Sequence, residues 1–130
     1  MVIKQLHAFD NGWKAVDTVI LEAGDDPRQL SLVDAETLKT ARGMDGLCTG
    51  KFDANLLTEG LSYRTLKVGD TFMAGDVVFE ITQKSKRCYD HCSLRQQGTC
   101  CPLPANTAFA KVVKGGTVSS GSELILKEEL

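Results

Sequence analysis

The chain has 130 residues, of which 42% are hydrophobic and 25% charged, and its formal net charge is -2 at pH 7. This length suits one domain with its own core, so we expect a single domain over residues 1–130. The charge argues against sequence-independent nucleic-acid binding, and no apolar run approaches the roughly 20 residues that cross a bilayer. The start, residues 1–5, lacks the apolar core of an export signal. We therefore expect a cytoplasmic protein with no nucleic-acid partner and no membrane partner.

The first predicted elements are a short strand and a short helix. Residues 30–32 alternate in polarity, and residues 34–42 have a helical composition. Ser31 or Asp34 is expected to cap the helix, and Gly43 suits the left-handed residue just past its end.

The second half of the chain predicts strands separated by glycine turns. Residues 71–74 and 77–82 are rich in β-branched and aromatic types, and a similar order returns at residues 108–113 and 124–126. The pattern predicts a mainly β fold, a small, mostly antiparallel closed β-barrel with one or two short helices. A closed barrel leaves no exposed edge strand.

Two details of this β region are also predicted. Gly115 and Gly116 are expected to form a turn with positive φ. One apolar stripe is expected to lie in the core: Phe72, Val78, Phe79 and Ile81.

Cysteines are the most informative feature of the composition. There are five, and the odd number without an export signal indicates reduced thiols. Four fall within fourteen residues, which indicates chemistry or metal binding rather than scattered core positions. They lie in residues 84–106, a stretch with two prolines that is predicted to be a long functional loop, more mobile than the strands. The five are Cys48, Cys88, Cys92, Cys100 and Cys101.

Several stretches, taken in order, resemble a known family. Residues 28–36 read R-Q-L-S-L-V-D-A-E, residues 51–61 read K-F-D-A-N-L-L-T-E-G-L and lead into residues 66–82, and Cys88 follows. They are similar to the R-Q-V-S-L-x-x-x-E stretch, the G-R-F-x-E-N-L-T-x-E-G-L segment and the signature cysteine of the MOSC family (molybdenum cofactor sulfurase C-terminal domain). The resemblance covers roughly residues 24–126, and the order and spacing of the pieces carry it.

The resemblance implies sulfur carriage as a persulfide, or binding of the molybdenum cofactor, through Cys88. It further implies proteins of molybdenum cofactor biosynthesis or molybdoenzymes as partners, and chemistry that is independent of pyridoxal phosphate. Whether the protein turns over, as a sulfur transferase or in a cofactor-related activity, or only binds, is left open by the sequence.

The residues around Cys88 suit this chemistry. Lys84, Lys86 and Arg87 precede it, and cationic neighbours favour the thiolate, the form that attacks sulfane sulfur and binds soft metals. Cys92 lies four residues further and would share a face of a helical turn, so it is the candidate resolving partner. Cys88 and Cys92 are therefore the candidate catalytic residues, with a small buried core residue as the alternative for Cys88.

Five further positions are candidates for cofactor binding. The planar guanidinium of Arg28 suits bidentate binding of an anion, and the alternative is a salt bridge at the rim of the barrel. Asn55 either hydrogen-bonds a ligand or satisfies backbone groups in an irregular turn. The remaining three are cations that would line an anionic site, with a solvated surface position as the alternative: Lys51, Arg87 and Lys111.

No metal site is predicted. The adjacent side chains of Cys100 and Cys101 diverge, so they suit tetrahedral zinc poorly. Two other interpretations stay open: a non-catalytic module that binds a pterin or a partner protein, with structural cysteines, and a small zinc-stabilised domain.

Overall fold

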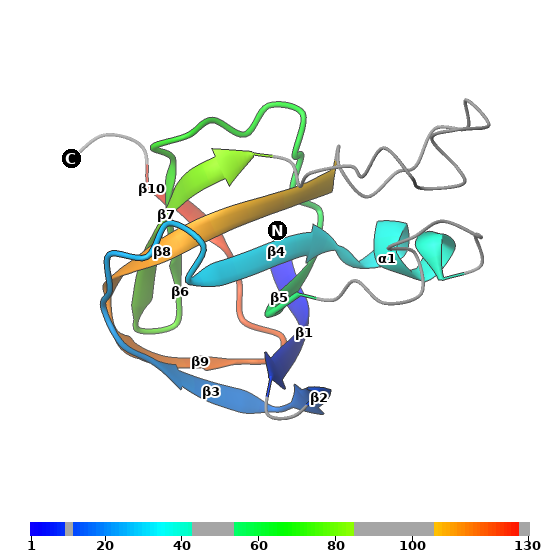
Figure 1. Ribbon diagram of the computed structural model, residues 1–130, viewed down its shortest axis with the longest axis horizontal. Helices are drawn as coiled ribbons and strands as arrows, with labels where there is room; N and C mark the ends of the chain where they lie inside the picture. Colours follow the sequence, from blue (N-terminus) through cyan, green and yellow to red (C-terminus); the bar gives the residue numbers. More distant parts are fainter. Residues whose placement is uncertain (10–11, 43–53, 85–105, 128–130) are drawn as a thin grey trace.

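The protein is mainly β. The computed structural model describes residues 1–9, 12–42, 54–84 and 106–127 (Figure 1). Strands predominate in this part of the chain, as predicted. The elements are β1 (Val2–Phe9), β2 (Trp13–Val16), β3 (Thr18–Leu21), β4 (Leu30–Asp34), α1 (Ala35–Ala41), β5 (Leu56–Glu59), β6 (Thr71–Ala74), β7 (Val77–Lys84), β8 (Thr107–Lys114), β9 (Gly116–Ser119) and β10 (Ile125–Lys127).

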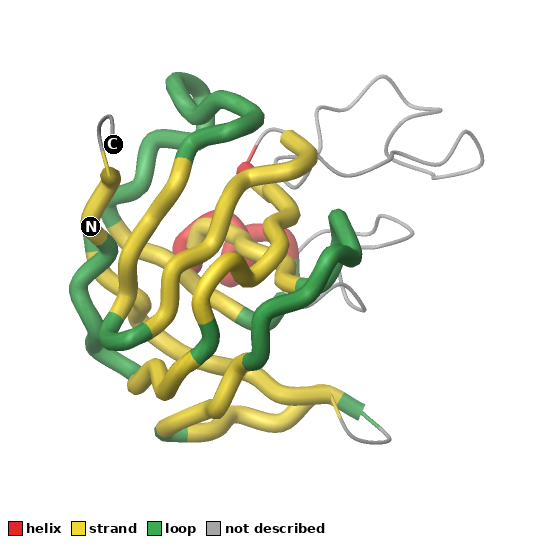
Figure 2. Tube along the Cα trace, turned by 90° about the vertical axis from the view of Figure 1, so that its left-hand side faces the viewer, coloured by secondary structure: helices red, strands yellow, loops and turns green. Residues whose placement is uncertain are grey.

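The strands form a curved eight-stranded sheet and a two-stranded ribbon (Figure 2). The order in the sheet is β10-β6-β7-β8-β4-β5-β1-β2, and β3 pairs with β9. Among the described strands all pairs are antiparallel except β4 with β5. This confirms the mostly antiparallel arrangement.

The predicted closed barrel is not confirmed, because the described sheet has two end strands, β2 and β10. The start of β1 nevertheless bonds to the residues just before β10. The Ile3 N–H donates to the Ser122 carbonyl (2.8 Å), and the Gly121 N–H donates to the Ile3 carbonyl (2.7 Å). An isolated bridge joins Val2 and Glu123. These bonds tie the two ends of the sheet together at one point.

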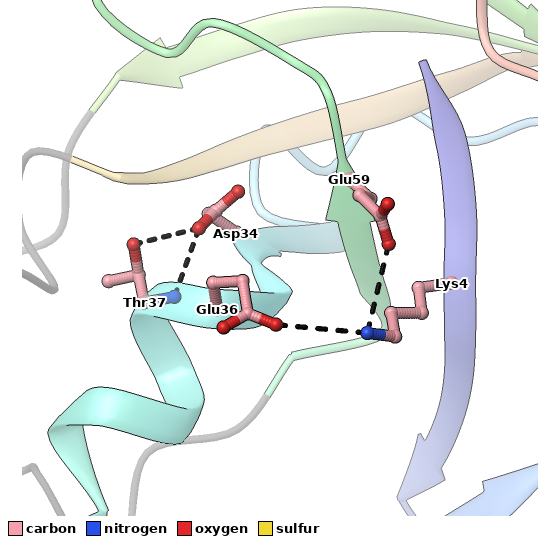
Figure 3. A network of polar contacts seen from close by, with 5 residues as sticks. All are labelled: Lys4, Asp34, Glu36, Thr37 and Glu59. Atoms are coloured by element: carbon pink, nitrogen blue, oxygen red, sulfur yellow. Dashed lines mark hydrogen bonds and ion pairs between the residues drawn. The ribbon is translucent and has the colours of Figure 1, made fainter.

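The helix α1 begins where the sequence predicts. The carboxylate of Asp34 accepts hydrogen bonds from the backbone N–H and the hydroxyl of Thr37, both at 2.9 Å (Figure 3). Asp34 is therefore the N-cap. Ser31, the alternative cap, lies within β4 instead. The predicted end residue Gly43 lies outside the described residues.

The main core lies between the inward faces of the strands. Phe72 and Phe79 stack at its centre, with ring centroids 5.7 Å apart. The prediction was wrong for Val78, which is only half buried, because alternate residues of β7 face opposite sides of the sheet and Phe79 and Ile81 take the inner one. A second, smaller core cluster lies beneath α1 and consists of Val33, Leu38, Ala54 and Leu57.

Gly115 and Gly116 are required for close approach rather than for positive φ. Neither belongs to the glycines with positive φ in the described chain. A Cβ on Gly115 would lie 2.6 Å from the Leu21 carbonyl oxygen, and one on Gly116 would lie 2.6 Å from Cβ of Asp76. The β8–β9 connection is therefore a point of close packing, at which the chain contacts the segments that contain Leu21 and Asp76.

Candidate functional site

Arg28 lies in the segment that leads into β4, and its backbone is held on both sides. Its N–H donates to Oδ1 of Asp26 (2.9 Å). The hydroxyl of Thr82, on β7, is within hydrogen-bonding distance of the Pro27 carbonyl and of the Phe109 carbonyl (3.2 Å to the latter). The position of Arg28 beside β7 and β8 is therefore fixed by backbone contacts.

The side chain of Arg28 is oriented by two further residues. Its Nε donates to Oε1 of Gln83 (3.2 Å), and its Cζ lies 4.8 Å from the ring centroid of Phe109. No ion pair of Arg28 is found in the described part of the chain. Arg28 makes a cation–π contact with Phe109 instead of the salt bridge that was the alternative. Its two terminal nitrogens make no hydrogen bond to any described residue. They are available as a planar fork for an anion.

Asn55 is engaged with its neighbours. Its Oδ1 accepts hydrogen bonds from the backbone N–H (3.0 Å) and the hydroxyl (3.1 Å) of Ser31, and its own N–H donates to that hydroxyl (3.1 Å). Its Nδ2 lies 3.5 Å from the carbonyl of His7, and the two backbones are also bonded. The side chain of Asn55 therefore fastens β4 and β1 to the start of β5. Its role as a cofactor ligand stays a prediction.

Strand register brings these residues to one face of the sheet. Ser31 of β4 pairs with Phe109 of β8, which pairs with Gln83 of β7. Asn55 contacts Ser31 at one end of this row, and Arg28 contacts Gln83 at the other end and Phe109 between them. Because alternate residues of a strand share a face, Lys111, two residues along β8, projects to the same side as Phe109.

Lys111 is half buried and has Glu80 as its cross-strand neighbour. It lines a cavity of about 350 Å³ beside the segment at Ala23, Gly24 and Asp25. The carboxylates of Asp25 and Glu80 reduce the positive potential there, so Lys111 is a weaker anion ligand than Arg28.

The other predicted site residues lie outside the described residues. They are Lys51, Arg87, Cys88 and Cys92, together with Cys48, Cys100 and Cys101. The predicted mobility concerns residues 84–106, of which 85–105 lie outside the described residues. These stay predictions. Within the described part of the chain, no three histidine, cysteine or acidic side chains are placed to hold a metal ion. Nor is any described helix long and apolar enough to span a membrane.

Sequence reasoning missed the residues that hold Arg28 in place. Phe109 sits between the buried residues Ala108 and Ala110 and is itself only half buried. An aromatic residue out of phase with the inward positions of a strand is the signal that would have shown it. Gln83 gave no such signal, because a β-bulge between Ile81 and Gln83 sets its orientation.

The comparison with known families identifies the chain. The family model described as MOSC domain matches residues 22–124. The chain belongs to the MOSC family. MOSC domains are associated with molybdenum cofactor sulfurase-like proteins, which agrees with the resemblance of the sequence.

Solved structures show the same MOSC fold. YiiM from Geobacillus stearothermophilus is 17% identical, with a TM-score of 0.67, over 97% of this chain and 74% of that one. YiiM from Escherichia coli is 23% identical, with a TM-score of 0.66, over 100% and 71%. A hypothetical protein with a crystal structure is 22% identical, with a TM-score of 0.69, over 100% and 70%. No curated protein matches the chain.

Proposed function

We propose that this MOSC protein carries sulfur as a persulfide on Cys88, or binds the molybdenum cofactor through it, and that Arg28 holds an anionic group of the sulfur compound or cofactor. One observation supports this most: the guanidinium of Arg28 is held by Gln83 and Phe109, while its terminal nitrogens have no partner among the described residues. Gln83 lies near the end of β7, the strand from which the chain continues toward Cys88.

Covalent geometry limits how far these groups can be from one another. Cys88 follows Lys84 by four residues, so their α-carbons are at most roughly 14 Å apart. Lys51 precedes Asn55 by the same number of residues, and the same limit applies. Cys88 is thus joined by a short stretch of chain to the end of β7 at which Gln83 contacts Arg28.

The described residues fit the cofactor in part. Arg28 would hold its phosphate, and Lys111 would add positive charge. Lys51 and Arg87, which lie outside the described residues, stay further candidates for the same role. Asn55 fits less well, because a ligand would compete with Ser31 for its amide. The cofactor, when bound, supplies a soft metal centre that accepts a thiolate ligand.

The sulfur-carrier step needs only the cysteines and a persulfide donor. The Cys88 thiolate attacks the outer sulfur of the donor, a new S–S bond forms, and the donor leaves as a thiolate while the outer sulfur keeps its proton. If the Cys92 thiolate then attacks Sγ of Cys88, a disulfide forms and hydrosulfide leaves. Neither step needs a further oxidant or reductant.

Sulfur loading tests this proposal. The protein is incubated with glutathione persulfide, an anionic donor, and peptide mapping by mass spectrometry locates the added sulfur atom. We expect loading on Cys88 in the wild type and in the control variant Cys48→Ser, and none at that position in Cys88→Ser. Arg28→Gln should slow loading about tenfold, because a charge-assisted hydrogen bond is lost, and Arg28→Lys should restore it only in part.

A neutral persulfide separates the role of Arg28 from that of Cys88. Loading from this donor should be the same in Arg28→Gln and in the wild type. The Cys88→Ser variant could take up as much sulfur as the wild type and bind the cofactor with the same affinity. The non-catalytic binding module would then be the better interpretation.

A further inference from the structure

A second polar groove lies between α1 and β1, and Arg28 is not among its described lining residues. Its volume is about 310 Å³, and none of its described lining residues lines the cavity at Lys111. Figure 3 shows its rim, where Lys4 of β1 reaches toward Glu36 of α1 and Glu59 of β5. The volume is at the lower end of the range for small-molecule sites.

Positive charge predominates along this groove. Three cationic side chains are among its described lining residues, namely Lys4, Lys39 and Arg42, and Glu36 is the one carboxylate among them. Lys4 is 3.8 Å from Glu36 and 3.7 Å from Glu59. Both ion pairs are long and exposed, so each contributes little and Lys4 is easily drawn to another anion.

The floor of the groove is apolar. Leu38 of α1 and Leu57 of β5 are 5% and 6% exposed and belong to the small core cluster beneath the helix. Ala35, which is half buried, completes it. A rim of cations above an apolar floor suits a ligand with two unlike parts: a charged group for the rim and an apolar body for the floor.

We propose that this groove binds a small organic phosphate whose apolar or aromatic body rests on Leu38 and Leu57. A phosphate carries enough charge and enough acceptor oxygens to engage Lys4, Lys39 and Arg42 at once, and arginine and lysine are its usual protein ligands. The proposal is independent of the sulfur chemistry of Cys88.

The same cations also have a structural role that a test must separate from binding. Lys39 lies in the last turn of α1, where a cation interacts favourably with the helix carbonyl groups. That role affects stability and predicts no ligand. Glu36 distinguishes the two, because removing its charge should strengthen phosphate binding while doing nothing for the carboxyl end of the helix.

Titration of the ¹⁵N-labelled full chain with phenyl phosphate tests the proposal. We expect saturable shifts confined to backbone amides of α1, of β1 near Lys4 and of β5 near Leu57. The double variant Lys39→Gln/Arg42→Gln should bind about tenfold or more weakly, Lys39→Gln alone should show part of that loss, and Glu36→Gln should bind about threefold more tightly. The control Lys114→Gln, an exposed lysine at the far end of β8, should bind like the wild type.

Inorganic phosphate, without an apolar body, should bind more weakly than phenyl phosphate. The proposal is overturned if phenyl phosphate gives no saturable shifts at α1, if the double variant binds as tightly as the wild type, or if the shifts centre on Arg28 and Phe109. Equal affinity for the two phosphates would remove the part of the proposal that concerns Leu38 and Leu57. Circular dichroism of each variant checks that it is folded.

Discussion

Arg28 and Asn55 both lie in the stretches that resemble the MOSC family, yet their side chains have different numbers of partners among the described residues. The guanidinium of Arg28 lies over the ring of Phe109, and its Nε donates to Gln83. Its two terminal nitrogens have no hydrogen-bond partner among the described residues. The oxygen of Asn55 already accepts two bonds from Ser31. The sequence predicts both residue types but not this difference, because it depends on contacts with β7 and β4.

The occupied side chain of Asn55 predicts a stability effect. Asn55→Ala leaves the Ser31 N–H and hydroxyl without their acceptor, so we expect the free energy of unfolding to fall by about 1–3 kcal/mol. Urea denaturation measures this. The exposed control Thr65→Ala should change it by less than about 0.5 kcal/mol. A stable Asn55→Ala protein that has lost cofactor binding would instead assign Asn55 to the site.

Tyr63 predicts a pH dependence. Desolvation by burial raises its pKa above the ordinary value of 10.0, the hydrogen bond with Thr58 lowers it in part, and the charge of Asp34 raises it again. Above pH 10 the unfolded chain therefore loses this proton while the folded chain keeps it. The folded state then binds more protons, and the free energy of unfolding falls as the pH rises.

The expected slope from this one group is about 1.4 kcal/mol per pH unit above pH 10. Tyr63→Phe removes it, although the variant is less stable at neutral pH because Thr58 loses a partner at 2.6 Å. Urea denaturation from pH 8 to pH 11 gives the difference between wild type and variant. A constant difference over that range would contradict the assignment.

At the scale of elements, the sequence pattern predicts β4, β10 and the strands between residues 71 and 114, but not β1, β2, β3 or β5. β6, β7, β8 and α1 with its cap at Asp34 agree with the sequence pattern. The pattern misses β1, because a bulge between Ile3 and Gln5 places the buried residues Ile3 and Leu6 three apart. β2 and β3 are largely exposed and carry little apolar signal.

The glycine pair at the β8–β9 connection is a second feature whose cause a local sequence pattern does not reveal. The sequence marks Gly115 and Gly116 as special but does not say why. The reason is the approach of Leu21 and Asp76, which lie far away in sequence. Such non-local contacts also decide whether a sheet closes, so neither feature follows from local pattern.

For the molecule as a whole, the sheet brings residues of separate strands together with a residue of a connection. Arg28, Gln83 and Phe109 belong to three different elements or connections, and strand register brings them together. The sequence names Arg28 and Lys111 as candidates without placing them. The alternation of β8 puts Lys111 on the same side of the sheet as Phe109, which Arg28 contacts. The position of Cys88 relative to them could not follow from pattern, because a connection of that length has no periodicity to interpret.

The bonds between β1 and the residues before β10 make a prediction about cooperativity. Ile3 is fully buried, pairs with Thr58 of β5, and exchanges backbone bonds with Gly121 and Ser122. Loss of β1 therefore removes support from both ends of the sheet at once. We expect Ile3→Ala to lower the free energy of unfolding by about 2–5 kcal/mol.

The loss should appear equally at both ends of the sheet. Amide hydrogen exchange of the most protected residues in β5 and in β6 should show the same decrease in opening free energy, because both open in one cooperative unit. Unfolding followed by the fluorescence of Trp13, on β2, should coincide with unfolding followed by circular dichroism. The control Val113→Ala, half exposed on β8, should change stability by less than about 0.5 kcal/mol. If β6 keeps its full protection in Ile3→Ala while β5 loses it, the two ends are independent and the bonds at Ile3 are not a cooperative link.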